Sequence, residues 1–330
     1  MKPFAYERAA DVAGAIAAVS GTDGARFLAG GTNLVDLMKL EVETPARLVD
    51  VNHLGLDAIE ERPDGGLLVG AGVRNSELAA HGAVRERWPA LAQALLAGAS
   101  GQLRNLATVG GNLLQRTRCA YFQDVSKPCN KRRSGSGCPA RAGDHRNLAV
   151  LGHSDACVAT HPSDMAVPMA AFGAVVHVQG PDGAARRVAM PGFHRLPGEE
   201  PQRDTVLAPG ELITAVELPP LALAARSRYR KVRDRASYAF AVTSIAAAVE
   251  VRDGTLQDCR IAFGGLAHAP WRAERAEAAL RGAPVGEAAF AAAADAELVE
   301  ARPLRDNAFK VPLARNLLVR TLTDLCEEER

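Results

Sequence analysis

The segment from about residue 115 to 160 constrains this chain most, because the hydrophobic periodicity of the rest of the sequence disappears there. The segment is rich in Arg, Lys, Gly, Ser and Pro, and it contains Cys119, Cys129, Cys138 and Cys157. A loop of this length inside a compact domain is either disordered or functional. The clustered cysteines favour a functional segment, because a bound metal centre can order chain that lacks a hydrophobic core.

The four clustered cysteines suit either a tetrahedral zinc ion or a cubane iron–sulfur cluster. Their spacing is C-x9-C-x8-C-x18-C, without the short C-x2–4-C pairs of most structural zinc sites. The wide loops therefore favour a 4Fe–4S cluster, with zinc or metal-free cysteines, reduced or disulfide-bonded, as the alternatives. Nearby cations would offset the negative charge of a cluster: Lys127, Lys131, Arg132 and Arg133. Cys259 and Cys326 lie elsewhere, and we expect them to be buried as small hydrophobic residues.

Composition excludes several classes of protein. The chain has 330 residues, which is long enough for two domains. Its formal net charge is +1, and so small a charge does not suit a large nucleic-acid-binding surface. No apolar run approaches about 18 residues, so no membrane insertion is expected. Residues 12–19 predict an amphipathic first helix rather than a signal peptide. We therefore expect a cytoplasmic protein, or a periplasmic one that is exported with a signal-bearing partner.

The remaining sequence predicts an α+β protein. Before the cysteine segment we expect strands at 4–6, 26–29 and 47–51, helices at 11–19 and 34–40, a hairpin of 56–60 with 67–71, and helical structure over 76–99 that is broken at Trp88-Pro89. After it we expect a helix and strand within 165–178, a strand at 212–218, a linker at 221–228, a hairpin of 244–252 with 259–263, and helices at 271–281, 286–300 and 312–327.

Two glycine turns are candidate cradles for a diphosphate. The first, Gly30-Gly31-Thr32-Asn33, lies between a predicted strand and a predicted helix, and the second is Gly110-Gly111-Asn112. Glycines let the backbone approach phosphates closely, and a helix N-terminus adds free N–H groups. Each turn alone is weak, because most Gly-Gly pairs are ordinary turns. Neither matches G-x-G-x-x-G, which disfavours a Rossmann fold.

The order of several motifs resembles the FAD-binding (medium) subunit of the xanthine dehydrogenase and aldehyde oxidoreductase family of molybdenum hydroxylases. The stretches that carry this resemblance cover essentially the whole chain: Pro3–Tyr6, Phe27–Leu34, Arg104–Asn112, Pro162-Ser163-Asp164, Glu211-Leu212-Ile213 and Tyr229–Arg233. Cys129–Arg132 and Gly135–Cys138 resemble the 4Fe–4S insertion of family members such as 4-hydroxybenzoyl-CoA reductase and periplasmic aldehyde oxidoreductase.

The resemblance implies cofactor-binding residues and no catalytic residue on this chain. The first loop would wrap the FAD diphosphate and ribityl, and the implied contacts are Arg26, Phe27, Leu28, Ala29, Gly30, Gly31, Thr32, Asn33 and Leu34. Opposite it, Thr108, Gly111 and Asn112 would hold the phosphates. Ser163 and Asp164 form the Ser-Asp element, Ile213 would pack on the cofactor, and Lys231 would lie near the flavin. Taken without the resemblance, Asp164 suits a helix cap and Lys231 a solvated lysine.

The resemblance also implies a domain plan. Residues 1–222 would form a two-subdomain FAD-binding (PCMH-type) domain, with subdomains 1–53 and 54–222 and the iron–sulfur insertion at about 115–160. Residues 223–330 would form a small C-terminal α+β domain with an antiparallel sheet and helices.

The implied function is electron transfer within a heterotrimer. A large molybdenum-cofactor subunit would oxidise the substrate, and a small 2Fe–2S subunit would deliver electrons to FAD and thence to an external acceptor. Two alternatives stay open: a stand-alone flavin oxidoreductase with a four-cysteine structural zinc, and a zinc-stabilised scaffold without enzymatic activity. The sequence gives neither the substrate nor the terminal acceptor.

Overall fold

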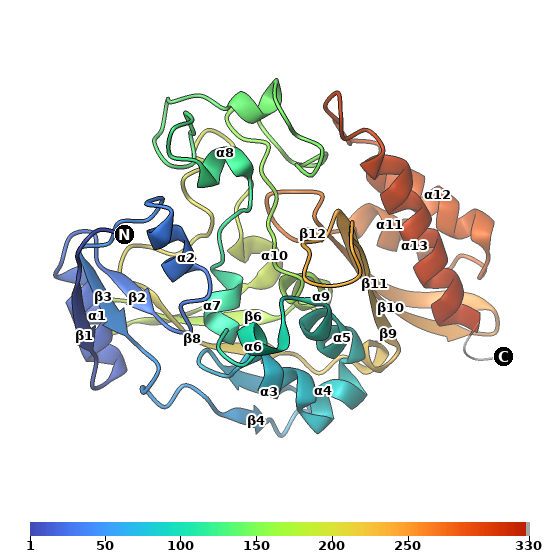
Figure 1. Ribbon diagram of the computed structural model, residues 1–330. Coiled ribbons are helices and arrows are strands. Elements are labelled where there is room, and N and C mark those ends of the chain that lie inside the picture. The colour runs from blue at the N-terminus through green and yellow to red at the C-terminus, as the bar shows by residue number, and fades with distance from the viewer. Residues whose placement is uncertain (328–330) are drawn as a thin grey trace.

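The computed structural model describes residues 1–327, and its N-terminal part is a small α/β unit (Figure 1). A parallel sheet of order β1-β3-β2 combines β1 (Ala5–Arg8), β3 (Arg47–Asp50) and β2 (Arg26–Leu28). Helices α1 (Val12–Ser20) and α2 (Leu34–Lys39) connect the strands. The side chain of Asp11 caps α1 by accepting a hydrogen bond from the Gly14 N–H at 2.7 Å. These elements are those that the sequence predicts.

The second sheet is antiparallel and has the order β4-β5-β8-β6-β7. Its strands are β4 (Ile59–Glu61), β5 (Leu67–Gly70), β8 (Leu212–Leu218), β6 (Val175–Gln179) and β7 (Ala185–Ala189). The predicted hairpin of β4 and β5 is confirmed. Strand β7 was not predicted, because it is an exposed edge strand without an apolar face.

Helices α3 (Asn75–Ala80), α4 (Gly82–Arg87), α5 (Pro89–Ala97) and α9 (Ala166–Ala171) pack with the second sheet around the largest hydrophobic core. The predicted break at Trp88-Pro89 is confirmed. A second break falls at His81, whose backbone is extended with ψ of 128°. Short helices α6 (Gly101–Arg104) and α7 (Val109–Leu113) follow, so Gly110-Gly111-Asn112 is helical and not the expected turn.

The C-terminal part is an α+β layer, drawn in gold to red in Figure 1, whose sheet also contributes Tyr229, Ala246 and Ala262 to the largest core. Its antiparallel sheet has the order β12-β11-β10-β9, from β9 (Ser227–Val232), β10 (Thr243–Arg252), β11 (Thr255–Gly264) and β12 (Trp271–Arg272). Helices α11 (Glu274–Leu280), α12 (Glu287–Leu298) and α13 (Lys310–Glu327) share its core. The linker prediction for 221–228 is wrong, because η2 (Ala222–Ala225) occupies part of it and β9 begins at Ser227. Residues 271–272 form a strand rather than a helix start.

The cysteine segment arches over the molecule between the N-terminal and C-terminal parts, in green in Figure 1. Its regular elements are α8 (Ala120–Gln123) and η1 (Pro139–Arg141). Contrary to expectation, the segment has a hydrophobic core of its own, centred on the fully buried Phe122 and Val158. Leu37 of α2 completes this core from the N-terminal part. Local packing therefore contributes to the order of the segment, together with whatever the cysteines bind.

Polar contacts attach the same segment to the C-terminal part. The buried ammonium of Lys310 donates hydrogen bonds to the carbonyls of Asn147, Leu148 and Gly265, at 3.2, 2.9 and 2.5 Å. Asn307 donates to the carbonyls of Leu148 and Ala149. These bonds satisfy backbone groups that would otherwise be buried and unpaired. Within residues 1–327, no helix combines the length and the apolar character needed to cross a membrane.

Candidate functional site

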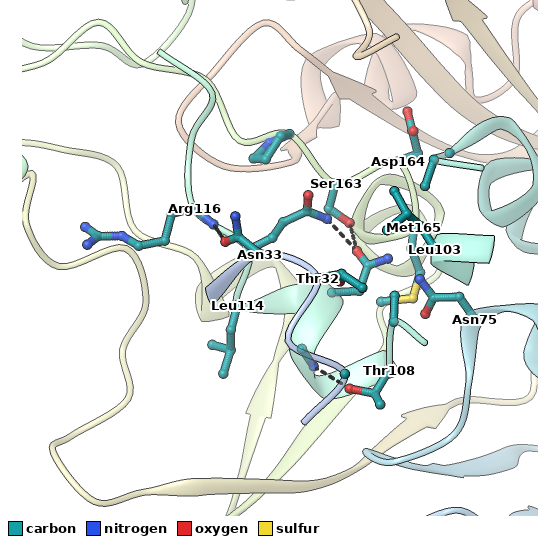
Figure 2. Close-up of a pocket in the computed structure, with 18 of the residues that line it drawn as sticks. Thr32, Asn33, Asn75, Leu103, Thr108, Leu114, Arg116, Ser163, Asp164 and Met165 are labelled. Atoms are coloured by element: carbon teal, nitrogen blue, oxygen red, sulfur yellow. Dashed lines mark hydrogen bonds between the residues drawn. The ribbon is translucent and has the colours of Figure 1, made fainter. Parts of the chain in front are cut away.

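A cavity of about 930 Å³ lies where the N-terminal unit, the second sheet with its helices, and the C-terminal sheet meet. Its volume is within the range of natural cofactor sites. Figure 2 shows Thr32, Asn33 and Ser163 gathered on one part of its wall, while the side chain of Arg116 points away. Elements that are distant in the sequence therefore build a single site.

The first glycine loop reaches this cavity between β2 and α2. A Cβ atom on Gly30 would lie 2.0 Å from the carbonyl oxygen of Leu106, so the backbone at residues 106–107 crosses directly over it. Gly31 has φ of +69°, a conformation that side chains with a Cβ rarely adopt. Glycine is thus required twice in this loop, once for close approach and once for backbone geometry.

The second glycine stretch faces the first from the start of α7. The Thr108 hydroxyl accepts a hydrogen bond from the Gly111 N–H at 3.2 Å and caps the helix. The Ser163 hydroxyl donates to Asn112 Oδ1 at 2.6 Å, and it accepts from the Ala166 N–H at 3.0 Å. The Ser163 hydroxyl thus bonds the first N–H of α9, while the Asp164 side chain bonds Tyr229 and Lys231 instead, so the helix-cap alternative for Asp164 is wrong.

Asp164 is instead part of a buried polar group with Lys231 and Tyr229. The Lys231 ammonium lies 2.7 Å from Asp164 Oδ2, and the Tyr229 hydroxyl donates to Asp164 Oδ1 at 2.5 Å. The side chain of Lys231 is only 4% exposed, so the solvated-lysine alternative is wrong. Burial raises the pKa of Asp164, and Lys231 and Tyr229 act in the opposite direction. Burial and the neighbouring Asp164 raise the pKa of Tyr229 well above its usual value, so it stays a hydrogen-bond donor.

The structure brings all the predicted FAD residues to the wall of this one cavity: Arg26, Phe27, Leu28, Ala29, Gly30, Gly31, Thr32, Asn33, Leu34, Thr108, Gly111, Asn112, Ser163, Asp164, Ile213 and Lys231. Sequence reasoning missed the loop at 234–242 and the residues Asn147, Leu148 and Arg118, which also line it. The Arg118 guanidinium stacks over the Phe240 ring at 4.9 Å. No local motif marks these residues, because only the fold brings them to the cavity.

The polar wall of the cavity is incompletely satisfied by the protein. Among the residues that the structure describes, Asn33 Nδ2, Asn75 Oδ1 and His161 Nε2 are buried without a hydrogen-bond partner. All three residues line the cavity. Buried polar atoms normally have partners, so these atoms indicate a polar ligand or ordered water. A ligand with phosphates, hydroxyls and an aromatic ring system fits this mixture of glycine loops, amides and apolar wall.

The four clustered cysteines converge on a second, small pocket. Cys119, Cys129, Cys138 and Cys157 all line it, with Cys119 and Cys157 buried and the other two half-buried. In residues 1–327, no group of three or more His, Cys, Asp or Glu side chains has an arrangement that could hold a single metal ion. The four cysteines thus line one pocket, although the described residues contain no group arranged for a single metal ion.

The surroundings of this pocket oppose thiolates in the metal-free protein. Burial raises the pKa of the Cys119 and Cys138 thiols, and it raises the pKa of Cys157 to about 12. The buried Lys131 ammonium acts to lower the pKa of Cys157 and is itself paired with Asp204. A bound cationic centre would therefore favour the thiolate forms of Cys119, Cys138 and Cys157 here.

The cysteine pocket and the large cavity share a wall. Cys119 lines both of them. Three residues earlier, the Arg116 N–H donates a hydrogen bond to Asn33 Oδ1 of the first glycine loop at 2.8 Å. The Arg116 side chain pairs with Glu43 of the N-terminal part at 2.5 Å and with Asp204 at 2.9 Å. The start of the cysteine segment thus fixes one edge of the cavity.

The fold and the cavity together are typical of one class of flavoprotein. In this class two lobes form an extended cavity between glycine loops, and a small α+β domain with an antiparallel sheet follows. Two family models match the chain in this order. The FAD binding domain in molybdopterin dehydrogenase matches residues 2–221, and the CO dehydrogenase flavoprotein C-terminal domain matches residues 227–325. The chain belongs to the family of FAD-binding subunits of molybdopterin-dependent dehydrogenases.

Relatives with this architecture are enzyme subunits. The chain is 53% identical over 325 residues, 98% of each chain, to the aldehyde oxidoreductase FAD-binding subunit PaoB of Escherichia coli. It is 26% identical to the glyceraldehyde dehydrogenase medium chain of Sulfolobus acidocaldarius, over 83% of this chain and 79% of that one. The structure of carbon monoxide dehydrogenase from Hydrogenophaga pseudoflava superposes with a TM-score of 0.77 at 27% identity and covers 99% of both chains.

Proposed function

We propose that this chain is the FAD-binding electron-transfer subunit of a molybdenum-dependent aldehyde oxidoreductase. The observation that carries the proposal is the single cavity on which both glycine loops, Asp164 and Lys231 converge. The aldehyde assignment is supported by the 53% identity to an aldehyde oxidoreductase subunit over almost the whole chain. The wider family includes xanthine dehydrogenase and carbon monoxide dehydrogenase subunits, so the substrate itself is determined by the molybdenum partner.

In this proposal the two glycine loops hold the FAD diphosphate from opposite sides. Gly30 and Gly31 bring the backbone close to the phosphates, and Asn33 Nδ2 is a donor without a protein partner within the described chain. Thr108, Gly111 and Asn112 complete the opposite wall. Bound FAD accepts electrons singly or in pairs, and nearby charges and hydrogen bonds tune its potential.

Lys231 and Asp164 act on the flavin as a pair. Each oxygen of the Asp164 carboxylate accepts one hydrogen bond, so each keeps a lone pair for a ligand hydroxyl or N–H group. The positive charge of Lys231 faces the cavity, where it stabilises negative charge that arrives with electrons. Because Asp164 compensates that charge at rest, the pair orients the ligand without leaving an isolated buried cation.

We propose that the cysteine pocket holds a 4Fe–4S cluster, with Cys119, Cys129, Cys138 and Cys157 as ligands. Two observations support it: the four cysteines line one pocket, and their wide sequence spacing lacks the short C-x2–4-C pairs of structural zinc sites. A cubane is wider than a zinc ion and suits ligands that surround a larger centre. The buried Lys131 would offset part of the negative charge of the cluster.

The proposed partners are a large molybdenum-cofactor subunit, which oxidises the aldehyde, and a small 2Fe–2S subunit, which passes electrons to this chain. An external acceptor then takes them from the flavin. The chain itself holds no catalytic residue in this scheme. Its compartment is the cytoplasm, or the periplasm by export together with a partner. The alternatives of a stand-alone flavin oxidoreductase and of a zinc scaffold have no support from the relatives, which are subunits of molybdenum enzymes.

The test is an anaerobic visible spectrum of the purified chain, with FAD, iron and zinc quantified on the same sample. Flavin bands over a broad iron–sulfur absorbance, with about four irons per FAD, are the expected result. Cys129→Ser should remove the iron, whereas Cys259→Ser, a change at a buried cysteine of the C-terminal sheet, should retain it. Zinc without iron would refute the cluster, and a colourless protein would refute the flavin assignment as well.

A further inference from the structure

Three histidines lie together beside the large cavity, and we call them the histidine cluster: His161, His194 and His268. The rings of His161 and His194 have centroids 4.2 Å apart. Within the described part of the chain, each of the three has one buried ring nitrogen without a hydrogen-bond partner: His161 Nε2, His194 Nδ1 and His268 Nε2. Three such atoms in one place are unusual, because an unpaired buried polar atom costs about 1–3 kcal/mol.

The hydrogen bonds of two members fix which nitrogen carries the proton. His194 Nε2 lies 2.8 Å from the carbonyl oxygen of Leu113, and His268 Nδ1 lies 2.9 Å from the carbonyl oxygen of Arg195. A carbonyl only accepts, so these nitrogens donate and are protonated. His194 Nδ1 and His268 Nε2 are therefore bare acceptors, on residues that are only 5% and 4% exposed.

The histidine cluster connects the cavity to the protein surface. His161 lines the cavity. At the other end, His268 Nε2 lies 3.8 Å from Asp204 Oδ1, and the Asp204 side chain is 27% exposed. The exposed part of this carboxylate is open to proton exchange with solvent, and the 3.8 Å gap is only slightly longer than a hydrogen bond. The bare nitrogens thus lie between a solvent-accessible carboxylate and the proposed flavin site.

The charges around the histidine cluster come from two parts of the chain, the cysteine segment and the loop before β8 that contains Asp204. Lys131 and Arg118 of the cysteine segment face His161, and Lys131 also faces His268. Asp204 faces both His194 and His268, and it is paired with Lys131 and with Arg116. Burial is the largest influence: it lowers the pKa of His194 and of His268 to about 4, and the pKa of His161 well below its usual value. The cluster is neutral at pH 7, and negative charge that arrives nearby raises its proton affinity.

We propose that the histidine cluster is a redox-linked proton site, which takes up a proton through Asp204 when electrons enter the flavin cavity and releases it when they leave. The inference rests on the proposed function. The proton comes from solvent and bonds to a bare imidazole nitrogen, and no other bond forms or breaks at the cluster. When the external acceptor removes the electrons, the same proton returns to solvent. A protonated cluster thereby compensates part of the negative charge that electrons bring to a buried site.

The experiment counts protons taken up per electron by the full chain with its cofactors bound. The protein is photoreduced anaerobically in weak buffer with a pH indicator, at several values from about pH 5.5 to 8, around the usual histidine range. The variants are His194→Gln and His268→Gln, which remove the bare nitrogen. His177→Gln is the control, because His177 pairs with Glu217 on the second sheet at 3.0 Å, away from the cavity wall.

We expect each cluster variant to bind fewer protons than the wild type, by up to about one per flavin reduced, and the control to match the wild type. Equal uptake in all proteins overturns the inference and leaves the proposed function intact. A preparation that binds no flavin overturns both. If the variants do not bind flavin, a reduced-minus-oxidised infrared spectrum of histidine-labelled wild type gives the answer: isotope-shifted imidazolium bands support the site, and their absence overturns it.

Discussion

Replacing Gly30 by alanine should separate the two glycine stretches that face each other across the cavity. The new Cβ would lie 2.0 Å from the Leu106 carbonyl oxygen and 2.7 Å from its carbon. Ordinary contact at a Cβ begins at 3.4 Å, so the backbone at residues 106–107 must move by 1.4 Å relative to Gly30. Both partners are backbone atoms, and no side-chain rotation can relieve the clash.

The displacement affects affinity for FAD more than folding. Overpacking of this size costs about 1–3 kcal/mol, and the loops can reduce the strain by moving apart. The separated loops then no longer hold the diphosphate from both sides. A loss of about 2 kcal/mol corresponds to a roughly 30-fold higher Kd for FAD.

The assay is a titration of the flavin-free protein with FAD, followed by flavin fluorescence, together with urea unfolding of the same samples. Gly101→Ala is the matched control, because a Cβ on this helical glycine meets no atom within 4 Å. The control should bind FAD as the wild type does. An unchanged Kd for Gly30→Ala, in a protein that unfolds cooperatively, would refute the assignment of this loop to the diphosphate.

Three further changes test the buried charges. Lys231→Met leaves the Asp164 carboxylate buried without its cation, so the free energy of unfolding in urea should fall by about 3 kcal/mol. Adding Asp164→Asn to this variant should restore part of that loss. Lys310→Met removes the donor to three buried carbonyls and should also cost about 3 kcal/mol in the same assay, while Lys39→Met at an exposed position should cost almost nothing. Burial lowers the pKa of His194 to about 4, so the unfolded chain binds this proton more tightly than the folded chain. The free energy of unfolding should therefore fall by about 3 kcal/mol as the pH drops from 6.5 toward 4. His194→Gln should flatten that dependence.

Much of the fold follows from local patterns that the sequence displays openly. The strand before Gly30 and the helix after it were predictable because a short apolar run precedes the two glycines and apolar residues follow them at helical spacing. Strand β9 was missed because Arg228, Arg230 and Lys231 dominate its sequence. Those charges are tolerated because partners elsewhere neutralise them: Asp324 of α13 pairs with the arginines, and Asp164 pairs with the lysine.

The sequence allowed the residues of the cavity wall to be predicted, but not how their side chains are arranged in space. A resemblance in motif order identified the residues on its wall, yet the pairing of Asp164 with Lys231 joins positions 67 residues apart. The histidine cluster had no sequence signal at all, since its members are separated by dozens of residues and no motif contains them. Such sites depend on long-range packing, which periodicity and spacing do not encode.

The hydrogen bond from the Arg116 N–H to Asn33 has a consequence for how the subunit matures. Cys119 lies three residues after Arg116, whose N–H bonds Asn33 at the edge of the large cavity, so a group bound at Cys119 would restrain residues 116–119 and, through them, Asn33. If the cysteine pocket holds the proposed cluster, metal loading should come first and prepare the cavity for FAD. In a cell that is short of iron, newly made subunits would remain poor in flavin even where flavin is abundant, so that iron supply would limit both cofactors.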